Sequence, residues 1–285
     1  MSDLIVERKL REFLDEDVGY GDITTDSVVD PATMAIGQVV CKERAIVAGL
    51  AESVTLLKLV GCEGKPKVRD GQEVPIGTVV LETSGRGVDL LKVERTMVNL
   101  LCHMSGVATA TEELVRIVKM NRRSARIACT RKTLPGLRYF EKRAVELGGG
   151  DTHRLRLDDA VLIKDNHLAL AGSITESVKK AKAKVSFTKK IEVEATSPRQ
   201  AVEAASAGAD IVLLDNMTPQ EVKKSVDLLE MKKLREQILV EVSGGITREN
   251  LAGYVKTGVD VISVGSITNS AEAIDMSMEL HSVKR

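Results

Sequence analysis

From residue 124 onward, short apolar runs rich in β-branched residues alternate with longer segments that carry apolar residues at helical spacing. This alternation is typical of repeated strand and helix units. Repeated units of this kind predict parallel strands, which either close into a barrel or remain an open doubly wound sheet. The predicted strands are Ser124 to Cys129, Ala160 to Lys164, Lys190 to Ala195, Asp210 to Asp215, Ile238 to Ser243 and Asp260 to Gly265.

Start signals for helices lie between these strands. Ser197 and Thr218 are predicted N-caps, because a hydroxyl accepts a hydrogen bond from the first exposed backbone amides of a helix. Pro135 is predicted to lie in the first turn of another helix, and residues 247–258 follow the fifth strand with a helical pattern. The second half of the chain is therefore expected to be an α/β domain.

The first third of the chain has a different pattern. Residues 3–15 predict a short amphipathic helix, which the Gly-rich residues 16–25 terminate. Runs typical of strands occur between residues 35 and 82, with Gly and Pro between them. These features predict a small α+β unit at the N-terminal end.

A longer helix follows this unit. Its apolar stripe recurs at helical spacing, whereas Arg95 and Asn99 fall on a different face. The stripe consists of Leu90, Val93, Met97, Leu101 and Met104. We expect an N-terminal α+β domain over residues 1–105, joined by the tail 270–285, and an α/β barrel over residues 106–269.

Composition restricts the possible functions. Of 285 residues, 43% are hydrophobic and only 2% are aromatic, so a base-stacking nucleic-acid surface is not expected. Acidic and basic residues balance at 41 each, which argues against attraction to polyanions or membranes. The N-terminal residues are charged throughout and the chain has no long apolar stretch, so we expect a cytoplasmic protein. The four irregularly spaced cysteines predict reduced thiols, without disulfides or zinc.

The candidate chemistry lies at the carboxyl ends of the predicted strands, the edge where parallel sheets bind ligands. A charged residue at one strand end is common in any loop, so the grouping carries the argument. The ends offer cations on two strands, acids on two and Gly-rich turns on two: Thr130, Arg131 and Lys132; Lys164, Asp165, Asn166 and His167; Glu194; Asp215 and Asn216; Ser243, Gly244 and Gly245; Gly265 and Ser266.

This grouping predicts a pocket for a small polyanion that carries phosphate. The turns after the last two strands precede helical segments, which suits backbone amides directed at a phosphate. Arg131 with Lys132, and His153 with Arg154, supply cations for carboxylate or phosphate. Glu194 and Asp215 suit either ribose hydroxyls or a Mg²⁺ ion carried by a diphosphate.

Several sequence blocks resemble the quinolinate phosphoribosyltransferase family, also called carboxylating nicotinate-nucleotide pyrophosphorylases. The resemblance runs nearly from end to end, and the order of the blocks is more specific than any one of them. The blocks are EDVGYGDITT (16–25), ERTMVNLLCHMSGVAT (94–109), TRKTLPGLR (130–138), EKRAVELGGGDTHR (141–154), VLIKDNH (161–167), IEVEA (191–195), LLDNM (213–217), EVSGGI (241–246) and VGSIT (264–268).

The resemblance implies an incomplete TIM-like barrel of six or seven strands beside an open-faced α+β sandwich, assembled as a homodimer or a higher oligomer. It also implies transfer of phosphoribosyl from phosphoribosyl pyrophosphate (PRPP) to quinolinate with decarboxylation, a glycosyltransferase step of NAD biosynthesis that uses Mg²⁺. Arg95 is then expected to complete the neighbouring subunit's site.

By the same resemblance, Arg131, His153, Arg154 and Lys164 bind the two carboxylates of quinolinate, and Lys132 lies near the diphosphate. Glu194 and Asp215 hold the ribose hydroxyls, directly or through magnesium, and act in catalysis with Lys164. The 5′-phosphate is expected against Ser243, Gly244, Gly245 and Gly265. Two positions depart from the family pattern: Cys129 stands where an acidic residue is common, and Arg156 replaces a small or neutral residue.

Other functions remain open from the sequence. One is a phosphoribosyltransferase for another pyridine acid, such as nicotinate, and another is a relative associated with molybdenum transport. Schiff-base chemistry at Lys164 and a non-catalytic sensor of sugar phosphates are further alternatives. The full basic set favours a dicarboxylate.

Overall fold

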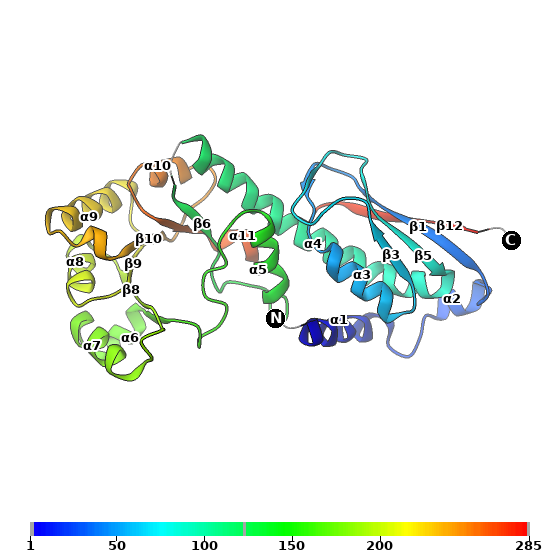
Figure 1. Ribbon diagram of the computed structural model, residues 1–285, viewed down its shortest axis with the longest axis horizontal. Helices are drawn as coiled ribbons and strands as arrows, with labels where there is room; N and C mark the ends of the chain where they lie inside the picture. The colour runs from blue at the N-terminus through cyan, green and yellow to red at the C-terminus, as the bar shows by residue number, and fades with distance from the viewer. Residues whose placement is uncertain (1–2, 122–123, 284–285) are drawn as a thin grey trace. The chain divides into compact units, whose positions relative to one another are not determined.

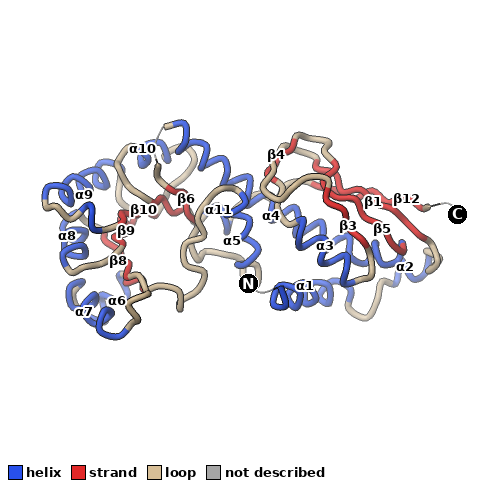
Figure 2. Tube along the Cα trace, in the orientation of Figure 1, coloured by secondary structure: helices blue, strands red, loops and turns tan. Residues whose placement is uncertain are grey.

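The computed structural model describes residues 3–121 and 124–283, which form two compact units. Unit 1 comprises the described residues of 1–112, 139–149 and 271–285, and unit 2 comprises those of 113–138 and 150–270. The course of the chain through both units is drawn in Figures 1 and 2. In the described part of the chain, no helix combines the length and apolar character needed to cross a membrane.

The predicted strands of the repeated units all form, and they make one parallel six-stranded sheet in unit 2. Its order is β6-β11-β10-β9-β8-β7, so the last strand lies beside the first, as in a barrel. The sheet ends at β6 and β7, which leaves the barrel incomplete, as expected. The strands are β6 (Arg126–Ala128), β7 (Val161–Ile163), β8 (Ile191–Ala195), β9 (Ile211–Asp215), β10 (Leu239–Ser243) and β11 (Val261–Ser263).

The two predicted N-caps of unit 2 are confirmed. Ser197 accepts a hydrogen bond from Gln200 N, and Thr218 accepts one from Glu221 N. The helices of this unit are α6 (Asp165–Ala171), α7 (Ile174–Lys184), α8 (Pro198–Ser206), α9 (Pro219–Met231), η1 (Arg235–Gln237), α10 (Leu251–Val255) and α11 (Ser266–Asn269).

The helix predicted to start at Pro135 is an exception. Helix α5 (Arg138–Leu147) begins after Pro135, which lies in a turn. Gly136 has φ +85° there, a left-handed conformation that ends any helical turn begun at the proline. The prediction of Pro135 in the first helical turn was therefore wrong.

Unit 1 contains an antiparallel sheet in the order β12-β1-β5-β3. Burial alternates along β1, so one face of the sheet is covered and the other is open. Strand β12 comes from the C-terminal end of the chain and pairs with β1 from Ala35↔Ser282 to Cys41↔Met276. The elements are α1 (Asp3–Val18), α2 (Ile23–Val28), β1 (Met34–Cys41), β2 (Ala45–Ile46), α3 (Leu50–Leu59), β3 (Glu63–Pro66), β4 (Glu73–Val74), β5 (Val79–Arg86), α4 (Gly87–Met120), α5 and β12 (Met276–Ser282).

The long helix α4 carries the predicted apolar stripe. Leu90, Val93, Met97, Leu101 and Met104 are all fully buried, while Arg95 and Asn99 are exposed on another face. Burying one such side chain stabilises the fold by roughly 1.5–3 kcal/mol. The stripe therefore anchors α4 in the core of unit 1.

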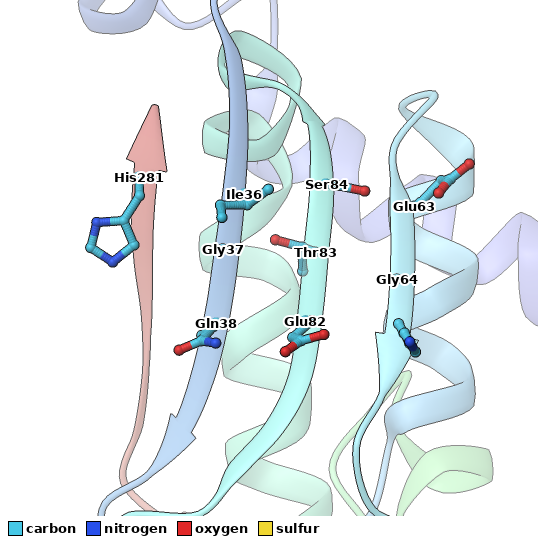
Figure 3. A pocket seen from close by; sticks show the side chains of 10 residues that line it. Ile36, Gly37, Gln38, Glu63, Gly64, Glu82, Thr83, Ser84 and His281 are labelled. Atoms are coloured by element: carbon cyan, nitrogen blue, oxygen red, sulfur yellow. The ribbon is translucent and has the colours of Figure 1, made fainter. Parts of the chain in front are cut away.

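The open face of the sheet in unit 1 forms a hollow of about 420 Å³. Figure 3 shows polar and charged side chains from neighbouring strands over this face, among them Gln38, Glu63, Glu82 and His281. Acids, an amide and an imidazole are mixed here without the concentration of cations predicted for the strand ends of unit 2. The hollow therefore does not match the predicted anion pocket.

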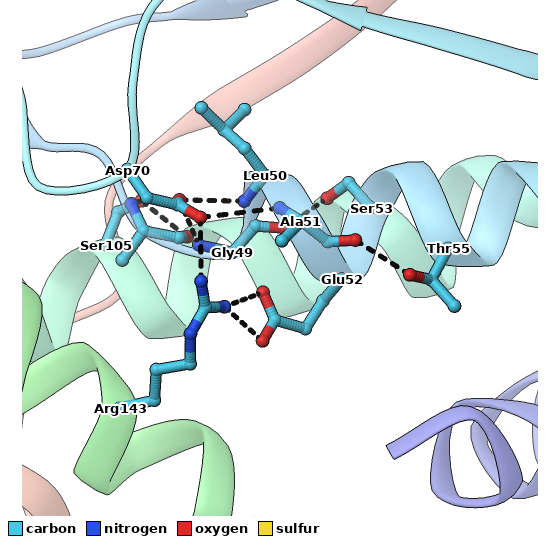
Figure 4. A network of polar contacts seen from close by, with 10 residues as sticks. Gly49, Leu50, Ala51, Glu52, Ser53, Thr55, Asp70, Ser105 and Arg143 are labelled. Atoms are coloured by element: carbon cyan, nitrogen blue, oxygen red, sulfur yellow. Dashed lines mark hydrogen bonds and ion pairs between the residues drawn. The ribbon is translucent and has the colours of Figure 1, made fainter. Parts of the chain in front are cut away.

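An ionic network is buried in unit 1. The guanidinium of Arg143 contacts both carboxylate oxygens of Glu52 and lies 3.2 Å from Asp70 Oδ2, as Figure 4 shows. Asp70 Oδ1 also accepts hydrogen bonds from Gly49 N (2.9 Å) and Leu50 N (3.0 Å) at the start of α3. The network thus ties α5 to α3 and satisfies backbone amides that the helix itself leaves unpaired.

Candidate active site

The carboxyl ends of the parallel strands in unit 2 surround a cavity of about 520 Å³. Each of β7 to β10 contributes side chains to it, and the loops after β6 complete the wall. The lining residues are Thr130, Arg131, Lys132, His153, Arg154, Leu162, Lys164, Asp165, Glu194, Leu213, Asp215, Asn216, Glu241, Ser243, Gly244 and Gly245.

One side of the cavity is basic. Arg154 donates from Nη1 to the carbonyl of Ala160 (3.1 Å), which fixes its guanidinium beside β7. Burial lowers the pKa of Arg154, and the nearby Arg131 guanidinium lowers it further. The Nε of Arg131 is buried without a hydrogen-bond partner among the described residues. An anion bound here would satisfy that donor and relieve the repulsion between the two arginines.

Lys164 lies at the end of β7, and its position is set by the start of α6. Its backbone amide donates to His167 Nδ1 (2.9 Å), and its ammonium forms an ion pair with Glu194 at the end of β8. This contact brings the basic and acidic sides of the cavity together.

The acidic side is formed by Glu194 and Asp215, at the ends of adjacent strands. Asn216 donates from Nδ2 to Asp215 Oδ2 (2.7 Å), and its φ of +54° places it in the left-handed region. Carboxylate oxygens accept hydrogen bonds from hydroxyl groups and are suitable ligands for Mg²⁺. This side of the cavity can hold a sugar, a magnesium ion or both.

The turn after β10 presents backbone rather than charge. Gly244 has φ +96°, and a Cβ there would lie 2.2 Å from Asn216 Oδ1, so glycine is required by conformation and by space. At Gly265, a Cβ would lie 2.9 Å from Lys132 Cδ. Both glycines let backbone approach the loops that line the cavity.

Below these groups lies a layer of buried polar side chains. His153 Nε2 is 3.4 Å from both Glu192 Oε2 and Glu241 Oε2. Burial opposes a charge on the ring, but the two carboxylates outweigh it and raise the pKa of His153 to about 10. Burial raises the pKa of Glu192 despite the opposing effect of His153. His153 itself adopts φ +51°, an unusual conformation for a residue with a side chain.

The structure brings most of the predicted site residues to this cavity. Those that line it are Arg131, Lys132, His153, Arg154, Lys164, Glu194, Asp215, Ser243, Gly244 and Gly245. Gly265 does not line it, but it lies against Lys132. Arg95 is exposed on α4 in unit 1 and does not line the cavity of this chain.

Sequence reasoning missed other residues of the site. Asn216 was noted only as a strand-end residue, and Glu192 was given no role. Glu241 received no role, although it is two residues before Ser243 in β10. Alternation along a strand places both side chains on one face, so this spacing could have identified Glu241.

The domains of the chain match a known family. Residues 22–105 match the family described as "Quinolinate phosphoribosyl transferase, N-terminal domain", and residues 107–279 match the family of the corresponding C-terminal domain.

Curated relatives and a solved structure match over nearly the whole of this chain. The chain is 46% identical over 275 residues to a "Probable nicotinate-nucleotide pyrophosphorylase [carboxylating]" of Methanothermobacter thermautotrophicus, covering 96% of this chain and 99% of the relative. A protein of the same printed name from Methanocaldococcus jannaschii is 44% identical over 273 residues, with 95% of each chain covered. The structure of the nicotinate-nucleotide pyrophosphorylase from Francisella tularensis superposes with a TM-score of 0.91 at 36% identity, covering 99% of this chain and 98% of that one. The chain therefore belongs to the quinolinate phosphoribosyl transferase family.

Proposed function

We propose that this chain transfers the phosphoribosyl group of PRPP to quinolinate with decarboxylation, giving nicotinate mononucleotide, CO₂ and pyrophosphate. This is a pentosyltransferase reaction of NAD biosynthesis, and family membership supports it. The observation that carries the proposal is the joining of a basic wall, two acids and a glycine turn around one cavity. We propose a cytoplasmic location.

The basic wall supports the choice of a dicarboxylate. In our proposal, Arg131, Arg154 and Lys164 bind the two carboxylates of quinolinate, and the unpartnered Nε of Arg131 is one of the donors. His153 lines the same wall of the cavity. Guanidinium groups match the planar geometry of carboxylates. A monocarboxylic ring such as nicotinate would leave part of this wall uncompensated.

The remaining walls suit PRPP. In our proposal Glu194 and Asp215 bind the ribose hydroxyls, Lys132 lies near the diphosphate, and the 5′-phosphate lies against Ser243, Gly244, Gly245 and Gly265. Glu194 must exchange its contact with Lys164 for a ribose hydroxyl, which leaves Lys164 available to the acceptor. A Mg²⁺ ion bound to the diphosphate would withdraw charge from the leaving group, and Asp215 and Glu194 are hard oxygen ligands that fit it.

The chemistry then depends on positioning and charge. The cationic wall directs the pyridine nitrogen of quinolinate at C1 of the ribose while the bond from C1 to the diphosphate breaks. Glu194 and Asp215, through the hydroxyls, stabilise positive charge on the ribose. The nitrogen becomes a pyridinium and stabilises the electron pair left at C2 when CO₂ departs. A proton from solvent then completes C2, so the decarboxylation itself requires no further cofactor.

We also propose that the active form is a homodimer in which Arg95 completes the neighbouring site. Arg95 is exposed on α4, off the buried stripe of that helix, so its guanidinium is accessible to a second chain. Mixing Arg95→Ala protein with Lys164→Ala protein would test this. Restored activity in the mixed dimer is expected, and its absence when both variants form dimers would contradict the arrangement.

The test of the proposed reaction is a substrate comparison. Purified protein with quinolinate, PRPP and Mg²⁺ should release CO₂ and pyrophosphate in equal amounts, with nicotinate mononucleotide as the product. Nicotinate in place of quinolinate should react at least about a hundredfold more slowly in kcat/KM. Equal rates with both acids would contradict the dicarboxylate specificity, and no pyrophosphate with either acid would contradict the proposed function.

Lys164→Ala should lower kcat/KM by about a thousandfold, corresponding to about 4 kcal/mol of transition-state stabilisation. The matched control is Lys223→Ala, because Lys223 is an exposed lysine of α9 that also forms an ion pair, with Asp227. The control should keep the activity of the unaltered protein. Similar losses in both variants would mean that Lys164 has no special part in the reaction.

A further inference from the structure

The interior of the barrel holds charge where such barrels usually hold branched apolar side chains. Glu192 on β8 and Glu241 on β10 are only 1% and 2% exposed, and Ser263 on β11 is 2% exposed. A buried carboxylate is costly unless it is paired and hydrogen-bonded. Two of them beneath the cavity therefore require a physical reason.

The contacts within this layer do not satisfy it. Ser263 donates from Oγ to Glu241 Oε1 (2.5 Å), and the ring of His153 is shared between Glu192 and Glu241. Glu192 Oε1 is buried without a hydrogen-bond partner among the described residues. A network that served stability alone would pair its acceptors, so this layer has more negative charge than its own donors can balance.

A metal ion is one explanation for the surplus, because ligand atoms of His153, Glu192 and Glu241 lie within 4.8 Å of one another. The other ring nitrogen argues against it. His153 Nδ1 accepts a hydrogen bond from the backbone amide of Arg154 (2.7 Å), so Nε2 is the nitrogen that carries the proton in the neutral ring, and a charged ring carries one there as well. A protonated Nε2 has no lone pair for a metal, and metal-bound histidines instead donate from the second nitrogen. The Nε2–H group is therefore a donor to the two carboxylates.

The positive charge that balances these acids is carried by the arginines of the cavity wall. The negative charge of Glu192 raises the pKa of the Arg154 guanidinium, whereas the positive charge of Arg131 lowers it. Arg154 also follows His153 directly in the chain, and its amide is tied to that ring. Both buried acids thus contact the histidine, and Glu192 also offsets the repulsion that Arg131 exerts on Arg154.

We propose that Glu192 and Glu241 are positioning residues for the acceptor site: both fix the ring of His153, and Glu192 also offsets the charge of Arg154 before the dicarboxylate binds. This inference rests on the proposed function. It assigns the two acids to the quinolinate part of the cavity, and not to PRPP or to the core alone. Ser263 holds Glu241 in place for the same purpose.

Glu192→Gln and Glu241→Gln keep the side-chain volume and remove a negative charge. If the acids were only background charge, their removal would strengthen binding of the dianion quinolinate. If they are positioning residues, each change should weaken quinolinate binding by about tenfold or more.

The experiment measures quinolinate binding by calorimetry without PRPP, and then KM for each substrate in turnover. For both variants we expect weaker quinolinate binding and a higher quinolinate KM, with the PRPP KM unchanged within about twofold. Ser263→Ala, a milder change, should weaken quinolinate binding in the same direction by about threefold. The Ser263→Ala variant still allows the proposal to be tested if a glutamine variant does not fold.

Glu52→Gln is the matched control, since Glu52 is 3% exposed and paired with Arg143 in unit 1. It should lower the melting temperature and leave quinolinate binding unchanged within about twofold. Unchanged or tighter quinolinate binding in the Glu192 and Glu241 variants would overturn the inference alone. An unaltered protein that does not bind or convert quinolinate would overturn the proposed function as well.

Discussion

The two units of the molecule each bury an ionic cluster, and the clusters differ in how completely they are satisfied. In unit 1, Arg143 pairs with Glu52 and Asp70, and Asp70 also receives amides at the start of α3. In unit 2, one histidine is shared by two glutamates at 3.4 Å, and an oxygen of Glu192 has no partner in the described part of the chain. The charged groups of the first cluster pair with one another, whereas the second keeps a buried acceptor unpaired among the described residues. Incomplete pairing of buried charge therefore distinguishes a functional layer from a structural one.

Arg143→Met gives the largest effect expected from this comparison. It leaves Glu52 buried without its guanidinium, which should lower the free energy of unfolding by about 3 kcal/mol. Urea denaturation would measure the loss. Binding of quinolinate to the folded fraction should not change, and a large change there would mean that the cluster of unit 1 also has a role in the site.

The pH dependence of stability tests the cluster of unit 2. The folded-state pKa of His153 is raised from 6.5 to about 10, so its stabilisation is complete below about pH 6.5 and is lost as the pH rises toward 10. Across that range the free energy of unfolding of the unaltered protein should fall by about 2–3 kcal/mol more than that of His153→Gln. Each pKa unit is worth about 1.4 kcal/mol, and the opposite pKa change of Glu192 cancels part of the contribution of His153. A difference between the two proteins that stays constant with pH would contradict a charged His153 in the folded protein.

Substitutions of two glycines are expected to give the smallest changes in stability, and comparing them separates backbone strain from a role in binding. Gly244→Ala should lower stability by about 1–2 kcal/mol and raise the KM for PRPP, because the new Cβ meets Asn216. Gly77→Ala in unit 1 is the control, since Gly77 has φ +83° but nothing within 4 Å of a Cβ. Gly77→Ala should lower stability without changing the KM for PRPP. If the two variants have equal KM values for PRPP, the turn after β10 is not part of the PRPP site.

The sequence predicted the strands of unit 2 and their polar ends because both depend on local patterns. It predicted Glu194 at a strand end but could not separate it from Glu192, since alternation gives both side chains the same face. Only the depth of the barrel distinguishes them: the side chain of Glu194 is 11% exposed and that of Glu192 is 1% exposed. The pairing of His153 with Glu241 joins distant segments, and Asn216, in its left-handed conformation, lies against Gly244 of another loop. No short-range pattern carries that information.

The pairing of β12 with β1 has a consequence for synthesis of the chain. Strand β1 spans Met34–Cys41 and its partner spans Met276–Ser282, so one edge of β1 has no partner until more than 230 further residues have been translated. An unpaired strand edge invites association with other chains, and such exposure is a common cause of aggregation during folding. Nascent chains and C-terminally truncated products of this protein should therefore depend on chaperones more than the finished molecule does.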